Sequence, residues 1–104
     1  MRLDYAAEAV AEVDEALAYY RAIDPALSKK LVAEIDESIR LILAMPFAWK
    51  SIDESIRQCR VKVFPYAFLY PVQLDVIGIV AFANTHRRPN YWRGRLASPL
   101  RPPQ

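Results

Sequence analysis

Apolar residues recur along the first half of the chain at the spacing of one strand and two helices. Residues 2–5 alternate between polar and apolar side chains, which is enough for one short strand. Two helical stripes follow, made of Ala9, Val13, Ala16, Leu17 and Tyr20 and then of Leu27, Leu31, Ile35, Ile39 and Ile42. Asp24-Pro25 provides an N-cap and a first-turn proline for the second helix, and Met45-Pro46 ends it. Because only Ala22-Ile23 links the stripes, we expect the helices to double back as an antiparallel hairpin.

After the second helix the pattern changes to the two-residue alternation of strands. We expect a loop over residues 47–54 and then a strand over residues 56–64. On this strand Cys59, Val61 and Val63 should face the helices, because both helical stripes need an apolar sheet face to pack on. In that position Cys59 is expected to be a buried thiol rather than a nucleophile.

Two further strands complete a three-stranded meander behind the helical hairpin. Residues 66–72 form the second strand, in which Pro71 should leave the pairing bulged or short. Residues 76–85 are apolar on both faces, so we place this third strand at the centre of the sheet.

Length and composition limit the protein to a few classes. The chain has 104 residues, which is room for one domain; we assign the domain to residues 1–97 and treat the proline-rich residues 98–104 as a tail. No apolar run approaches the roughly 18–20 residues that cross a bilayer, and the start of the chain lacks a signal-peptide apolar region. We therefore expect a cytoplasmic protein that does not contact membranes. One Cys and one His are too few for a disulfide framework or a zinc site, so we expect no metal and no cofactor.

The two halves of the chain carry opposite charge. Residues 1–54 hold 6 Lys/Arg and 11 Asp/Glu, a net charge of −5, and residues 55–104 hold 8 and 1, a net charge of +7. The basic half favours a polyanionic or acidic partner, and a basic surface without a binding role is the alternative. The acidic residues of the helices, Glu8 and Glu12 among them, are expected on solvent-exposed faces.

One hairpin and one C-terminal segment carry a more specific pattern. The sequence reads Phe64-Pro65-Tyr66 between two strands, Tyr70 in the second strand, and His-Arg-Arg-Pro-Asn-Tyr-Trp-Arg-Gly-Arg over residues 86–95. With Ile56-Arg57 and the helical hairpin, this order resembles the RelE/ParE family of bacterial type II toxin–antitoxin toxins over residues 2–95. The resemblance implies an α+β fold of order β-α-α-β-β-β, with the helical hairpin on one face of a mainly antiparallel sheet. It also implies a growth-inhibiting toxin that a cognate antitoxin neutralises.

The resemblance leaves two activities open. Some members of the family cut mRNA on the ribosome, and ParE-type members poison DNA gyrase without a known catalytic site. Metal-independent RNA cleavage needs a base for the 2′-hydroxyl proton and cations for the phosphate. His86 is the natural base, although a histidine at a strand end can equally cap or pack. The other candidates for a nuclease site are Arg60, Lys62, Arg88 and Tyr91, which we expect on the sheet face away from the helices.

The segment after the last strand also offers residues for a macromolecular partner. The candidates for contacts with the antitoxin or the target are Arg87, Arg88, Tyr91, Trp92, Arg93 and Arg95. Its arginines suit acidic antitoxin residues and RNA equally well, and Tyr91 and Trp92 are expected to be the apolar anchors of the antitoxin contact. We favour ParE-like inhibition of DNA gyrase. The alternatives are a ribosome-dependent mRNA endonuclease and a non-toxic basic nucleic-acid-binding module.

Overall fold

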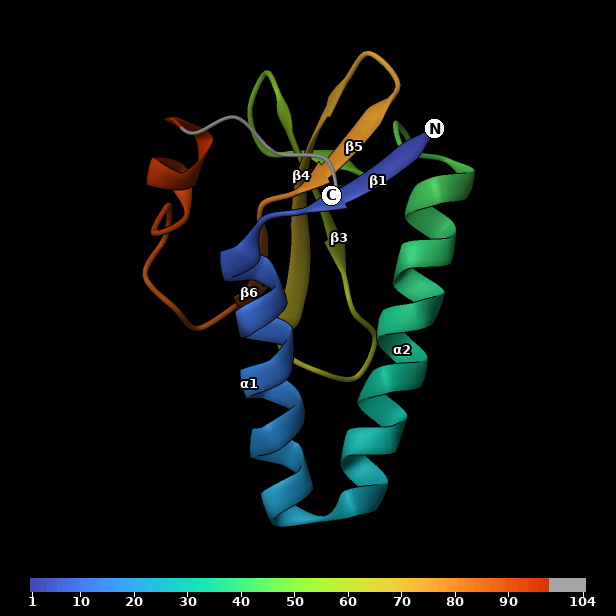
Figure 1. Cartoon of the computed structure of the whole chain (residues 1–104), viewed down its shortest axis with the longest axis vertical. Helices are drawn as coiled ribbons and strands as arrows, with labels where there is room; N and C mark the ends of the chain where they lie inside the picture. Colours follow the sequence, from blue (N-terminus) through green and yellow to red (C-terminus); the bar gives the residue numbers. More distant parts are fainter. Residues whose placement is uncertain (98–104) are drawn as a thin grey trace.

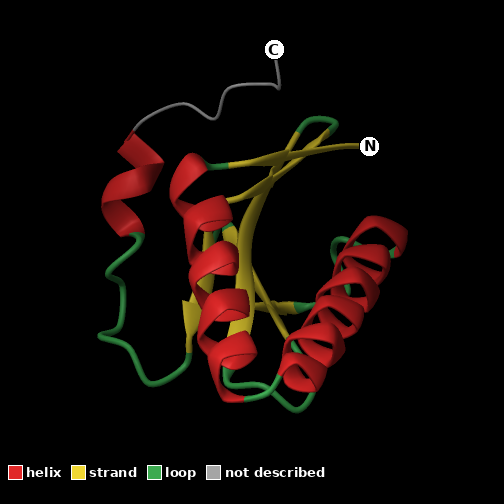
Figure 2. Ribbon diagram, turned by 60° about the horizontal axis from the view of Figure 1, so that its bottom comes forward, coloured by secondary structure: helices red, strands yellow, loops and turns green. Residues whose placement is uncertain are grey.

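Two helices cover one face of a six-stranded sheet, as Figure 1 and Figure 2 show. The computed structural model describes residues 1–97, and the expected tail lies outside them. The elements in chain order are β1 (Arg2–Tyr5), α1 (Ala7–Ile23), α2 (Pro25–Ala44), β2 (Lys50–Ser51), β3 (Ile56–Arg60), β4 (Tyr66–Gln73), β5 (Val76–Ile79), β6 (Ala81–Asn84) and the 3₁₀ helix η1 (Arg93–Ala97). The predicted α+β fold is confirmed, but the expectation of a loop throughout residues 47–54 is wrong, because Lys50–Ser51 pairs with β3 as the short strand β2. Neither α-helix in the described part of the chain is long and apolar enough to span a membrane.

β4 is the central strand of the sheet. The strands follow the order β1-β5-β4-β3-β2, and β6 pairs with β4 beyond the end of β5. The β1–β5 pair is parallel and the other pairs are antiparallel, so the sheet is mainly antiparallel as expected. The prediction of one central strand over residues 76–85 is wrong, because this stretch divides into β5 and β6 and lies beside β4.

A bulge separates β5 from β6. The register of β4 with β5 differs by one residue from its register with β6, so the β5–β6 stretch contains one extra residue. Val80 and Ala81, although consecutive, pack in the same hydrophobic cluster, and the Val80 N–H donates to the Leu69 carbonyl at 2.9 Å. Pro71 lies opposite this bulge, where its missing N–H is tolerated, and the expected bulge is confirmed.

The helical hairpin turns at a single residue. α1 runs through Ile23, so Asp24 alone links the helices, and the prediction that Ala22-Ile23 forms the link is wrong because both residues belong to α1. The Asp24 side chain accepts a hydrogen bond from the Ala26 N–H at 3.0 Å, and Pro25 lies in the first turn. The predicted N-cap and first-turn proline are therefore confirmed.

The sheet buries side chains on both faces. Beneath the helices the main core includes Leu31 of α2 and Phe68 and Tyr70 of β4, all fully buried. Cys59 is 1% exposed in this core while Arg60 is exposed, which confirms the predicted strand phase at these positions. The buried residues of a smaller core on the opposite face are Ile56, Leu69, Val80, Ala81, Ala83 and Trp92. The segment after β6 therefore covers part of the face that the helices leave open.

β3 ends earlier than expected, and the chain turns sharply before β4. Val61 is buried but Val63 is 74% exposed, so the prediction that Val63 faces the helices is wrong. The alternation stops because the Val61 N–H donates to the Tyr66 carbonyl at 2.9 Å, which closes a short loop between the strands. Within this loop Val63 has a φ of 74°, a left-handed conformation that strains a β-branched residue.

Replacing Val63 by glycine should relieve this strain. We expect V63G to leave the free energy of unfolding unchanged or to raise it by up to about 1 kcal/mol, because glycine adopts positive φ without a Cβ clash. The matched variant Val61→Gly removes a buried side chain and should lose about 2–4 kcal/mol. Chemical denaturation measures both variants, and equal losses would contradict the exposed, left-handed placement of Val63.

Candidate functional site

A groove lies on the sheet face opposite the helices, against the segment that follows β6. Its volume is about 590 Å³, and Leu69 and Ala83 of the smaller core line it. The predicted site residues that line it are Arg60, His86, Arg87, Arg88, Tyr91 and Trp92. The fold therefore brings β3 and residues 86–92 together in one cavity.

The groove holds only part of the nuclease set that the resemblance implied. Arg60, His86 and Arg88 line it with exposed side chains. Lys62 does not line it, since β3 ends at Arg60 and the chain turns away. Within residues 1–97 the imidazole of His86 makes no hydrogen bond, and only its backbone N–H is held, by the Asn84 side chain at 2.9 Å. The groove thus offers cations that can bind a phosphate. It also contains His86, whose ring no described neighbour orients.

Three of the predicted binding residues turn inward onto Glu12 of α1. The Arg95 guanidinium donates to Glu12 Oε1 at 2.6 Å, and the Arg87 guanidinium lies 3.3 Å from Oε2. The Tyr91 hydroxyl donates to the same Oε2. The Glu12 side chain is only 10% exposed. The prediction of a solvated Glu12 is therefore wrong, because donors from distant parts of the chain compensate its burial.

The same carboxylate occupies the outer edge of β6. In the described part of the chain β6 pairs only with β4. The Phe82 N–H donates to Glu12 Oε1 at 3.2 Å, and Arg95 donates to the Val80 carbonyl at 2.9 Å. Side chains thus satisfy backbone groups that a neighbouring strand would otherwise bind. Burial and the hydrogen bond to Glu12 raise the pKa of Tyr91, which keeps its hydroxyl a donor at neutral pH.

A second set of contacts holds the segment after β6 on the sheet face opposite the helices. Arg93 forms an ion pair with Asp53 at 2.7 Å, and its guanidinium lies 4.6 Å from the centre of the Trp92 ring. Hydrogen bonds from the Ser55 N–H and then from Arg93 lower the pKa of Asp53. Trp92 is 4% exposed and packs in the smaller core. Its ring holds residues 86–95 on the sheet and also lines the groove.

The remaining candidate groups are structural. Cys59 lies in the main core, and burial raises the pKa of its thiol to about 11, so the expected buried thiol is confirmed. Among residues 1–97 no three His, Cys, Asp or Glu side chains are grouped closely enough to hold a metal ion.

Sequence reasoning missed Glu12 and Asp53. Glu12 lies between Ala9 and Ala16 on the buried face of α1, and a carboxylate within an apolar stripe is the signal of a buried ion pair. Its partner Arg95 lies 83 residues further along the chain, so no local pattern identifies the pair. Asp53 lies in the predicted loop, and no feature of the sequence around it indicated that Arg93 would be its partner.

Comparison with known proteins defines the fold. A chain in the structure of the chromosomal ParDE TA system from P. aeruginosa matches with a TM-score of 0.71 and 21% sequence identity. The match covers 83% of this chain and 97% of that chain. No protein-family model and no curated protein matches the sequence. The resemblance to the RelE/ParE family is therefore confirmed at the level of the fold.

The Glu12 contacts predict a large loss of stability when the charge is removed. Glu12→Gln leaves the Arg95 guanidinium, which is 15% exposed, without its anion, so we expect a loss of about 2–4 kcal/mol in the free energy of unfolding. Asp14→Asn makes the same change of charge at an exposed position of α1 and should stay within about 0.5 kcal/mol of the parent protein. Urea denaturation compares the two, and similar values would contradict the buried network.

Proposed function

We propose that this protein is the toxin of a type II toxin–antitoxin module, that a cognate antitoxin neutralises it, and that it acts by ParE-like inhibition of DNA gyrase. The observation that carries the proposal is the fold shared with a chain of the ParDE TA system over 83% of this chain. At 21% identity this likeness concerns the fold alone, so the choice between binding a target and cleaving RNA is argued from the groove.

The contents of the groove favour binding of a macromolecule over cleavage of RNA. Of the five residues considered for cleavage, Lys62 lies outside the groove and the Tyr91 hydroxyl is bound to Glu12. Arg60, Arg88 and His86 remain. Two arginines beside an unoriented histidine suit the binding of an anionic surface better than proton transfer, which requires an aligned base and acid.

A ribosome-dependent mRNA endonuclease is the second candidate function. Arg60, His86 and Arg88 do line one cavity, and that is the specific observation in its favour. A non-toxic basic module that binds nucleic acid would use the same cations through their attraction to phosphates. Only the two toxin candidates should inhibit growth, so a growth assay separates them from the non-toxic module.

The surface that we assign to the antitoxin lies between the helices. Trp92 is buried and Tyr91 is held by Glu12, so we propose that the apolar anchoring of the antitoxin comes from other residues. An apolar cavity of about 260 Å³ is lined by Tyr5, Val10, Val13, Ile35 and Phe68. Val10 is 45% exposed at this cavity, which makes it accessible to an apolar segment of the antitoxin.

Expression of the chain without an antitoxin should arrest bacterial growth through DNA damage. We expect DNA breaks and an SOS response with intact transcripts, because a poisoned gyrase leaves cleaved DNA. Sequencing of transcript ends and an SOS reporter measure the two responses in one culture. Transcripts cut at codon positions with intact DNA would support the nuclease, and normal growth with folded protein present would support the non-toxic module.

A charge placed in the cavity between the helices should weaken antitoxin binding. We expect Val10→Glu to raise the Kd for the cognate antitoxin about tenfold or more, because the carboxylate would be desolvated in an apolar contact. Val32→Glu is the matched control, since Val32 is 43% exposed on α2 and does not line the cavity. Calorimetry measures both, and equal affinities would place the antitoxin elsewhere.

A further inference from the structure

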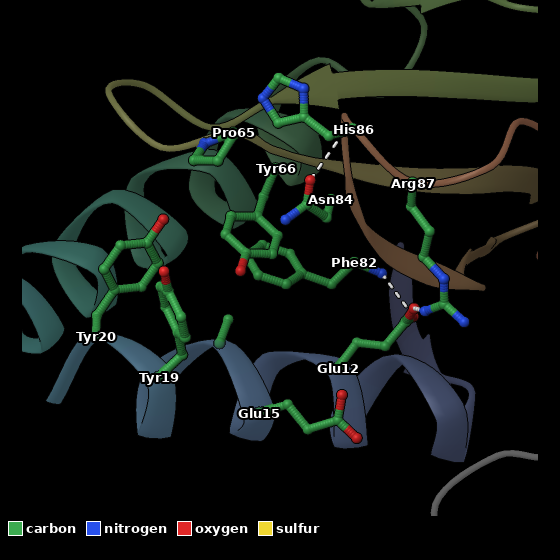
Figure 3. Close-up of a pocket in the computed structure, with 11 residues that line it drawn as sticks. Glu12, Glu15, Tyr19, Tyr20, Pro65, Tyr66, Phe82, Asn84, His86 and Arg87 are labelled. Atoms are coloured by element: carbon green, nitrogen blue, oxygen red, sulfur yellow. Dashed lines mark hydrogen bonds and ion pairs between the residues drawn. The ribbon is translucent and has the colours of Figure 1, made fainter. Parts of the chain in front are cut away.

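A second cavity opens between α1 and the β4–β6 pair, on the helix side of the sheet (Figure 3). Its volume is about 560 Å³. The lining comes from α1 on one side and from β4, β6 and the start of the next segment on the other. It shares only Asn84, His86 and Arg87 with the groove described above. Its aromatic residues have no role in the proposed function.

Tyrosine rings occupy one end of this cavity. The Tyr66 ring stacks on Phe82 with centroids 4.6 Å apart and planes inclined by 4°. Tyr20 meets Tyr66 edge-on at 6.3 Å, and Tyr19 meets Tyr20 edge-on at 5.0 Å. In Figure 3 the three phenol groups gather at one end, with Arg87 at the other. Burial and the neighbouring Tyr20 raise the pKa of Tyr66, so this end holds neutral hydroxyls and electron-rich ring faces.

The charge left over in this cavity is negative, and it belongs to Glu15, whose carboxylate points along α1 toward Glu12 in Figure 3. Arg87 is paired with Glu12 and lies over the Tyr91 ring at 3.8 Å, so its guanidinium is already engaged at the far end. Glu15 is exposed and forms no ion pair with any residue of the described part of the chain. Glu15 and Tyr19 are four residues apart on α1 and therefore lie on one helical face. A carboxylate and several tyrosine rings thus line one accessible space.

We propose that the tyrosine end of this cavity binds an arginine side chain of a protein partner. The guanidinium would lie against the ring of Tyr19 or Tyr66 and pair with the Glu15 carboxylate. Aromatic faces attract cations, and a carboxylate adds a charge-assisted hydrogen bond. The proposal goes beyond the proposed function because it requires neither toxicity nor a particular target.

The fold contains an internal example of this contact beside the cavity. Arg87, which lines the far end of the cavity, lies over the Tyr91 ring outside it and pairs with Glu12, so a tyrosine and a glutamate of this fold already hold one guanidinium. Arginine fits the open end better than lysine, because its planar group stacks on rings and sheds water more easily than an ammonium. An acidic side chain would meet the uncompensated charge of Glu15 and be repelled.

A small probe tests the site on the full chain. N-acetyl-arginine methylamide should produce saturable shifts in the NMR signals of the Tyr19, Tyr20 and Tyr66 rings. The citrulline analogue has nearly the same shape without the charge and should bind clearly more weakly. Glu15→Gln should weaken binding of the arginine probe by about threefold or more. Asp14→Asn makes the same charge change at an exposed neighbour outside the cavity and should leave the affinity unchanged.

A second pair of variants tests the aromatic contribution. Tyr19 and Phe47 are both 60% exposed, so neither substitution removes core packing. Tyr19→Ala should weaken binding of the arginine probe, whereas Phe47→Ala should not, since Phe47 does not line the cavity. The proposal is overturned if the arginine probe gives no saturable shift, if the citrulline analogue binds equally well, or if N-acetyl-glutamate methylamide binds better. Equal affinities of the Glu15 and Asp14 variants would also overturn it.

Discussion

The buried carboxylate of Glu12 determines how the C-terminal part of the described chain lies on the fold. Removing a carboxylate from water costs several kcal/mol unless donors replace the lost hydration. Here the donors are the guanidinium groups of Arg87 and Arg95, the Tyr91 hydroxyl and the Phe82 N–H. All of them come from β6 or the segment after it. That segment therefore cannot leave α1 without exposing both an unpaired charge and an open strand edge.

Local patterns predicted the elements well, and long-range contacts account for the errors. The cap at Asp24 and the burial of Cys59 follow from residues within one element, so the sequence was sufficient for them. The extra residue at Val80 and the outward turn at Val63 depend on how strands pair, which periodicity cannot show. The site was less predictable than the fold. Arg95 was among the predicted binding residues, but its partner Glu12 lies far away on the first helix, so the sequence around Arg95 could not identify it.

These contacts change how the net positive charge of residues 55–104 is interpreted. Its net charge of +7 suggested a continuous surface for an acidic partner. In the fold Arg87 and Arg95 pair with Glu12, and Arg93 pairs with Asp53. The exposed cations that remain at the groove are Arg60 and Arg88. Acidic residues of the first half thus neutralise much of the basic segment, which leaves a compact cationic groove on one face and apolar and aromatic cavities on the other.

The gyrase assignment is tested most directly with purified components. The full chain is added to DNA gyrase, relaxed plasmid and ATP, and the topology of the plasmid is followed on gels. The account predicts loss of supercoiling with accumulation of cleaved plasmid, and recovery when the cognate antitoxin is added in equal amount. Unchanged supercoiling at saturating, folded protein, together with cleavage of ribosome-bound mRNA by the same preparation, would contradict it.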